Sequence, residues 1–133
     1  MSPHRWEVRV YYEDVDLAGI VYYANYLRFI ERARSEMVRA AGIDQPAMRA
    51  AGLVFAVRRV EADYLRPARY DDRLVVETVL AEVGGARFAM DQAVLRDGEA
   101  LFRARVDLAC MDLAGRPRRV PGAVRAMAGG SGT

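Results

Sequence analysis

Lysine is absent from this sequence, and histidine and cysteine each occur once. All 20 basic residues are arginine, which excludes a Schiff-base lysine and the phosphate-binding lysine of a P-loop. His4 lies near the start of the chain, so Ser-His-Asp and Cys-His triads and histidine-rich metal sites are excluded as well. Cys110 can form no disulfide within the chain, as is usual in a reducing compartment. An enzyme of this composition is expected to use a carboxylate as its acid–base group.

Length and charge indicate one ordinary globular domain. The 133 residues are 53% hydrophobic and 29% charged, with no hydrophobic run near the ~20 residues of a membrane span. We therefore expect a cytoplasmic protein that does not insert into membranes. The 20 arginines are interspersed with 18 acidic residues, so no nucleic-acid partner is expected. We assign residues 1–121 to a single domain and expect the Gly-rich tail, 122–133, to be disordered.

Hydrophobic periodicity predicts five strands and one long helix. Residues 6–12 favour a strand, and from about Tyr23 apolar residues recur every three or four positions as far as Gly42, which can end a helix. A short helical turn is expected over 46–51. Further strands are predicted over 53–65, 73–83, 87–96 and 101–110, the last three joined by Gly-Gly and Asp-Gly turns. This order predicts an α+β fold with one mostly antiparallel sheet.

A single helix can cover only one face of such a sheet. Strands 74–83 and 88–95 carry apolar residues among the polar ones of both faces. Association through the sheet would bury these residues, and we therefore predict a homo-oligomer.

The segment most suggestive of chemistry is 11–26, which begins YYEDVD and leads through a glycine into the helix. A helix N-terminus offers unpaired N–H groups and a partial positive charge, which can polarise a carbonyl oxygen. A nearby carboxylate could attack that carbonyl or activate water. The same pattern also suits a simple turn or helix cap, and the residues alone leave both interpretations open.

This segment resembles the signature of the hotdog-fold acyl-CoA thioesterases, in particular the Tol–Pal-associated (YbgC-type) and 4-hydroxybenzoyl-CoA thioesterases. The matching residues are Asp14, Asp16, Gly19, Val21, Tyr22 and Tyr26. Residues 29–36, 63–72 and 115–121 are also similar to the Tol–Pal group, so the resemblance covers about residues 5–121. It implies the hotdog fold, a five-stranded, mostly antiparallel sheet wrapped around one long helix. It also implies edge-to-edge dimers, with the acyl site at the dimer interface, that commonly pair into tetramers.

The resemblance implies roles for residues of the loop and the helix start. Asp16 would be the catalytic carboxylate, as nucleophile or as general base. The backbone N–H of Tyr23, at the helix start, would polarise the thioester carbonyl. The Tol–Pal group often has histidine at this position, whereas the hydroxybenzoyl group has an aromatic residue, and a backbone donor is compatible with either. Gly19 and Tyr22 are further candidates for the substrate site.

Other positions would support the loop or bind the CoA part of the substrate. Asp14 and Asn25 are expected to hold the loop in place. Of the basic run that binds CoA phosphates in the hydroxybenzoyl enzymes only Arg87 is present, and Arg118 and Arg119 are candidates to replace it.

The function implied is hydrolysis of an acyl-CoA to a free carboxylic acid and CoA, without a metal or organic cofactor. A thioesterase acting on acyl carrier protein is an alternative, because an arginine-rich surface suits an acidic carrier. A non-catalytic acyl-CoA-binding or scaffold protein linked to the Tol–Pal envelope system is another. The presence of Asp16 in the acidic motif favours the enzyme.

Overall fold

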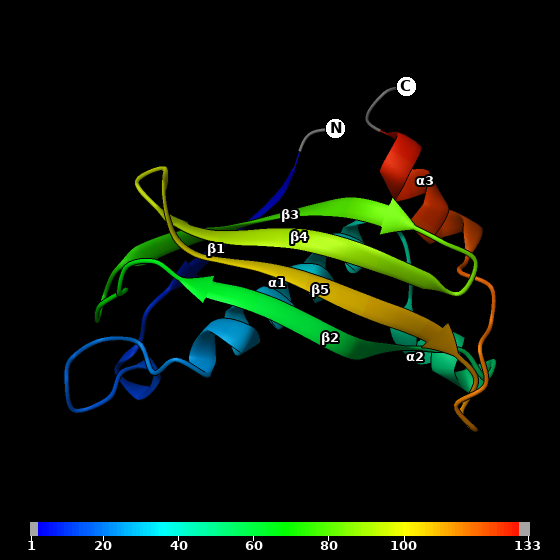
Figure 1. The fold of residues 1–133 in the computed structure, drawn as a ribbon, viewed down its shortest axis with the longest axis horizontal. Coiled ribbons are helices and arrows are strands. Elements are labelled where there is room, and N and C mark those ends of the chain that lie inside the picture. Colours follow the sequence, from blue (N-terminus) through cyan, green and yellow to red (C-terminus); the bar gives the residue numbers. More distant parts are fainter. Residues whose placement is uncertain (1–2, 131–133) are drawn as a thin grey trace.

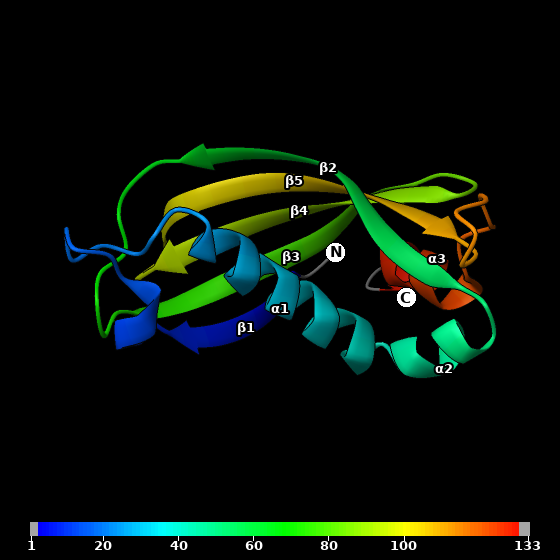
Figure 2. The ribbon, with the colours of Figure 1, turned by 90° about the horizontal axis from the view of Figure 1, so that it is seen from below.

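A curved five-stranded sheet and one long helix form the structure of this chain (Figures 1 and 2). The computed structural model describes residues 3–130. The strands are β1 (His4–Arg9), β2 (Val54–Tyr64), β3 (Arg73–Val83), β4 (Arg87–Arg96) and β5 (Glu99–Met111). The helices are α1 (Asn25–Ala40), α2 (Gln45–Ala50) and α3 (Gly122–Gly130). Neighbouring strands pair antiparallel in the order β1-β3-β4-β5-β2, which confirms the predicted α+β architecture.

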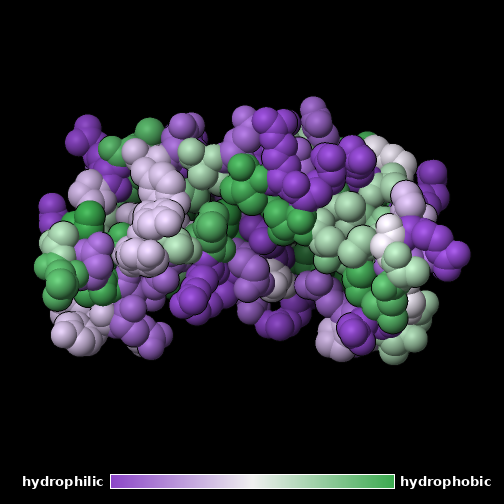
Figure 3. All heavy atoms as spheres, turned by 60° about the horizontal axis from the view of Figure 1, so that its bottom comes forward, coloured by the Kyte–Doolittle hydropathy of each residue, from purple (hydrophilic) through white to green (hydrophobic). Residues whose placement is uncertain are grey.

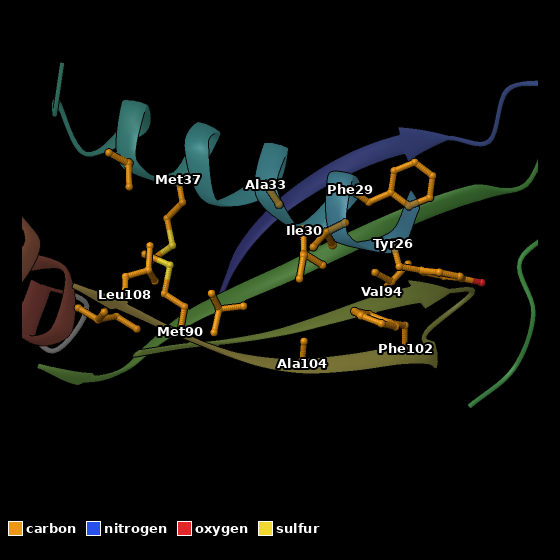
Figure 4. Close-up of a cluster of buried hydrophobic side chains, with 14 of the residues drawn as sticks. Tyr26, Phe29, Ile30, Ala33, Met37, Met90, Val94, Phe102, Ala104 and Leu108 are labelled. Carbon is orange, nitrogen blue, oxygen red and sulfur yellow. The ribbon is translucent and has the colours of Figure 1, made fainter. Parts of the chain in front are cut away.

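The core lies between α1 and the inner face of the sheet. Phe29, Ile30 and Ala33 of α1 are almost completely buried, at the helical spacing that the sequence predicts. Ile30 and Ala33 point toward the sheet, where Val94 of β4 and Phe102 of β5 lie (Figure 4). Burying one large apolar side chain contributes about 1.5–3 kcal/mol, so this layer fixes α1 against the sheet.

The predicted and observed strands agree closely for β3 and β4 and differ for β1. The first strand was expected over 6–12 but spans His4–Arg9, and Tyr12–Asp14 form a short 3₁₀ turn, η1. The reason is that Val10 pairs with a loop instead of with β3. Its N–H donates to the carbonyl of Asp72, and its carbonyl accepts from the N–H of Asp71.

The prediction of a disordered tail is wrong for residues 122–130, which form α3. Val124 of this helix is fully buried, and the Arg125 guanidinium donates to the Gly84 carbonyl at 2.7 Å. These contacts attach α3 to the β3–β4 turn and outweigh the weak helix propensity of its glycines. Residues 131–133 lie outside the described part of the chain.

Ion pairs across neighbouring strands cover the outer face of the sheet. The Arg105 guanidinium forms a bidentate ion pair with the Asp91 carboxylate, at 2.8 and 3.0 Å. Arg5 forms an ion pair with Glu77 at 2.7 Å. Within residues 3–130, no helix has the length and apolar character to cross a membrane. No three metal-ligating side chains come together within the same residues.

The turn after β5 is organised by the Asp112 carboxylate. It accepts hydrogen bonds from the N–H groups of Ala114 and Arg116 and from the Arg116 side chain, each at 2.9 Å. The Arg116 N–H has the largest effect, and together these bonds outweigh the opposing effect of burial, so the pKa of Asp112 is held below its ordinary value of about 3.9.

A lowered pKa in the folded state means that the charged carboxylate stabilises the fold above about pH 4 and loses this effect as the pH falls through the folded-state pKa. We expect Asp112→Asn to lower the urea midpoint at pH 7 and to have a smaller effect at pH 3. The control is Glu13→Gln, which removes a carboxylate charge from an exposed position. An Asp112→Asn penalty that stays constant between pH 7 and pH 3 would contradict this account.

Candidate active site

The segment between β1 and α1 forms a short hairpin-like loop. Val15 and Val21 pair as a bridge, so residues 16–20 make a tight turn that Gly19 completes at φ +79°. The Val21 N–H donates to the carbonyl of Ala68 at 2.8 Å, and Ile20 bridges Arg69. The crossover from β2 to β3 therefore holds this loop at one end of the sheet, where it extends beyond the strands (Figure 1).

Asp14 ties the loop to the start of α1. Its side chain is buried and accepts from the Tyr11 N–H at 2.8 Å and from Asn25 Nδ2 at 2.9 Å. Its carbonyl accepts from the Tyr22 N–H. The structure therefore brings together the two residues expected to support the loop, and both oxygens of this carboxylate are already occupied.

Asp16 lies two residues further on, in a different environment. Its carboxylate is exposed, and Oδ1 accepts from the Ala18 N–H at 2.8 Å, which sets its direction. The Oδ2 atom accepts no hydrogen bond from any residue in the described range 3–130. Of the two aspartates, only Asp16 has an oxygen free to attack a carbon or to take a proton from water.

The helix begins two residues later than predicted, at Asn25, and Tyr23 belongs to the turn that precedes it. The Asn25 N–H donates to the Tyr22 carbonyl at 2.8 Å, which fixes the peptide between Tyr22 and Tyr23. The N–H of that peptide, on Tyr23, meets no protein acceptor within residues 3–130. A free donor at the positive end of a 16-residue helix is suited to stabilise an oxyanion.

Three tyrosine rings lie together near the start of α1. The rings of Tyr22 and Tyr23 lie 5.0 Å apart, and Tyr23 meets Tyr64 of β2 edge-on at 6.2 Å. The three side chains are about half exposed. The Tyr26 hydroxyl, by contrast, is inside and accepts from the Ala68 N–H at 3.0 Å, and burial raises the pKa of Tyr26.

The sequence indicated no role for Tyr64, although its hydroxyl contacts the helix start. It donates to the Tyr23 carbonyl at 2.9 Å from a position 41 residues further along the chain. Tyr64 stands within the 63–72 stretch similar to the Tol–Pal group, which is the one signal that could have pointed to it.

The candidate phosphate-binding arginines lie at the opposite end of the sheet from Asp16. The loop end is marked by Leu101, whose carbonyl accepts from the N–H groups of Leu65 and Arg66. At the other end, the backbone N–H of Arg118 donates to the Cys110 carbonyl, and Arg87 of β4 lies opposite Ala109 of β5. Leu101 and Cys110 are nine positions apart along β5, which is about 30 Å at ~3.3 Å per residue. A single chain therefore does not place Arg87 and Arg118, or Arg119 beside it, next to Asp16.

A family model, curated relatives and solved structures all relate this chain to thioesterases. The family model of the thioesterase-like superfamily matches residues 10–127. The chain is 40% identical over 119 residues to the acyl-CoA thioester hydrolase YbgC of Escherichia coli O157:H7, covering 88% of this chain and 89% of that one. It is 44% identical over 107 residues to the acyl-CoA thioesterase YbgC of Haemophilus influenzae, with 80% and 79% covered.

Solved structures show the same fold. A probable thioesterase from Bartonella henselae superposes with a TM-score of 0.85 at 39% identity, covering 90% of this chain and 100% of that one. A hypothetical protein from Aquifex aeolicus gives a TM-score of 0.88 at 28% identity, with 94% and 98% covered.

The environment of Asp14 predicts a structural effect of its loss. Asp14→Ala leaves the Tyr11 N–H and the Asn25 side chain without their acceptor in a buried site, at a cost of about 1–3 kcal/mol. We expect a urea titration to show this loss of unfolding free energy. Glu13→Ala removes the exposed neighbouring carboxylate and should change stability by less than about 0.5 kcal/mol. Equal effects of the two substitutions would show that Asp14 does not hold the loop.

Proposed function

This chain belongs to the thioesterase-like superfamily and is a thioester hydrolase, and from that premise we propose that it hydrolyses acyl-CoA to a free carboxylic acid and CoA with Asp16 as the catalytic carboxylate. The observation that carries this proposal is the combination of a free Asp16 oxygen and a free Tyr23 N–H in one loop–helix unit. The names of the YbgC relatives support acyl-CoA as the substrate.

The proposed reaction uses these two groups at the carbonyl of the thioester. The carbonyl oxygen accepts from the Tyr23 N–H, and its growing negative charge in the transition state strengthens that bond. Asp16 either attacks the acyl carbon to form an anhydride that water opens, or takes a proton from the attacking water. In both routes the C–S bond breaks, the hydroxyl of water stays on the acyl group, and the CoA sulfur receives a proton.

We propose that the enzyme is a homodimer joined along β2. This strand is one of the two edges of the sheet, and its apolar residues Val57 and Val60 are 47% and 40% exposed. An unpaired edge of this kind favours pairing with a second copy. The face that β2 shares with α1 carries hydrophobic residues along its middle as well as at its ends (Figure 3). We further propose that two such dimers pair into a tetramer and that the enzyme is cytoplasmic.

Antiparallel pairing of β2 with its copy would complete the site. The Tyr64 end of β2 would then lie beside the Val54 end of the partner strand, and Val54 pairs with Met111 at the end of β5. The loop that carries Arg118 and Arg119 follows Met111. The dimer would therefore bring these arginines of one chain toward Asp16 of the other, where they can bind CoA phosphates.

A cavity of about 170 Å³ between α1, β2 and the sheet is the proposed acyl site of the dimer. The apolar residues that line it are Val38, Phe55, Val57, Phe88, Met90 and Leu108. Phe55 and Val57 place it near the Val54 end of β2, which in the proposed dimer would lie toward Asp16 of the partner chain.

Release of free thiol from a panel of short-chain, long-chain and aromatic acyl-CoAs tests this function. We expect Asp16→Asn to lose at least about 10²-fold in kcat with an unchanged melting temperature, whereas Glu13→Gln in the same loop keeps its activity. Preferential turnover of carrier-bound acyl groups would instead indicate a thioesterase for acyl carrier protein, which the exposed arginines also suit. Binding without turnover of any thioester would support the scaffold protein linked to the Tol–Pal system and contradict our proposal.

A further inference from the structure

Two consecutive peptide groups before α1 are held through their carbonyl oxygens. The Tyr22 carbonyl accepts from the Asn25 N–H at 2.8 Å, and the Tyr23 carbonyl accepts from the Tyr64 hydroxyl at 2.9 Å. In a trans peptide the N–H points away from the carbonyl, and the described residues contain no cis peptide. Fixing each carbonyl therefore also fixes the N–H of the next residue, on Tyr23 and on Ala24.

Both of these N–H groups lack a protein acceptor within residues 3–130. Ala24 is the residue immediately before α1 and already has helical dihedral angles, φ −70° and ψ −20°. Successive N–H groups at a helix start point to the same side, outward along the helix axis. One oxyanion can accept from two such donors, as it does in oxyanion holes that contain two backbone N–H groups.

We propose that Tyr64 is a positioning residue that holds the Tyr23–Ala24 peptide so that the Ala24 N–H acts with the Tyr23 N–H as a second donor to the thioester oxyanion. This inference rests on the proposed function, because it needs the thioester carbonyl to bind at the start of α1. The Tyr64 hydroxyl itself does not touch the reacting atoms.

The surroundings of Tyr64 suit it to this task. Its ring packs edge-on against Phe102 at 4.9 Å and Tyr26 at 5.5 Å, so the hydroxyl approaches the Tyr23 carbonyl from a fixed direction. Desolvation raises the pKa of Tyr64 above its ordinary value of about 10, and the neighbouring hydroxyls of Tyr23 and Tyr26 act in the same sense. The hydroxyl therefore remains protonated and able to donate throughout the neutral pH range.

The test compares Tyr64→Phe with the matched control Tyr70→Phe. The second variant also removes a hydroxyl from a half-exposed tyrosine, at the same end of the molecule, whose ring contacts only the Tyr12 ring among the described aromatic pairs. Loss of the positioning bond should lower kcat by about tenfold, less than the 10²–10³-fold effect of losing a whole donor. KM and the melting temperature of Tyr64→Phe should match those of wild type, because the ring still packs.

A spectroscopic measurement separates positioning from mere structural support. The probe is a ketone analogue of the acyl-CoA in which CH₂ replaces the thioester sulfur, with a ¹³C-labelled carbonyl. Hydrogen bonds from Tyr23 and Ala24 should lower its infrared C=O frequency on binding to wild type. We expect a smaller shift in Tyr64→Phe and the full shift in Tyr70→Phe.

Each outcome bears on a different claim. Wild-type kcat and a full frequency shift in Tyr64→Phe would overturn the role of Tyr64 and leave the proposed function standing. An unshifted carbonyl in the wild-type complex would overturn both, because no oxyanion site would then exist at the start of α1. A lowered kcat with a full shift would also contradict the inference, since the donors would still be in place.

Discussion

The unpaired N–H groups at the start of α1 are the constraint on which the candidate site depends. A helix cannot satisfy its first N–H groups itself, and most proteins supply a capping side chain. In this chain Ala24 provides no such cap, and the preceding carbonyls are held by Asn25 and Tyr64. The donors are fixed in direction without being used. A site built from the backbone needs neither lysine nor histidine, which agrees with a sequence that lacks the first and has one of the second.

The two aspartates of the loop have different roles because their environments differ. Asp14 is buried, and its oxygens are taken by the Tyr11 N–H and the Asn25 amide. Asp16, two residues away, is exposed and keeps one oxygen free. Because Asn25 is the first residue of α1, the bond to Asp14 also sets the position of the loop relative to the helix start. The Asp14 carboxylate thus helps to position Asp16, the proposed catalytic carboxylate.

Local patterns predicted most of the fold, and the misses follow from contacts that such patterns do not contain. The bounds of β3 and β4 agree with the prediction, because turn residues mark both ends of the β3–β4 hairpin. The early end of β1 depends on Val10 pairing with residues about 60 positions away, and α3 depends on Val124 reaching the core. Tertiary contacts of this kind override the propensity of a glycine-rich segment.

The sequence predicted only part of the candidate site, because some of its contacts also join residues far apart in the chain. Asp16 and Tyr23 stand in a contiguous motif, so the resemblance pointed to them directly. The contact between Tyr64 and Tyr23 spans 41 residues and involves a backbone atom, which no motif reports. The separation of Asp16 from Arg118 likewise became visible only in the folded chain, and it supports the site at the dimer interface that the resemblance implies.

The most direct test of the central claim is a crystal structure of the protein with the ketone analogue bound. The account predicts that the ketone oxygen lies about 3 Å from the Tyr23 nitrogen, with the free Asp16 oxygen facing the carbonyl carbon. A carbonyl bound away from the start of α1, or an Asp16 side chain turned away from it, would contradict the account.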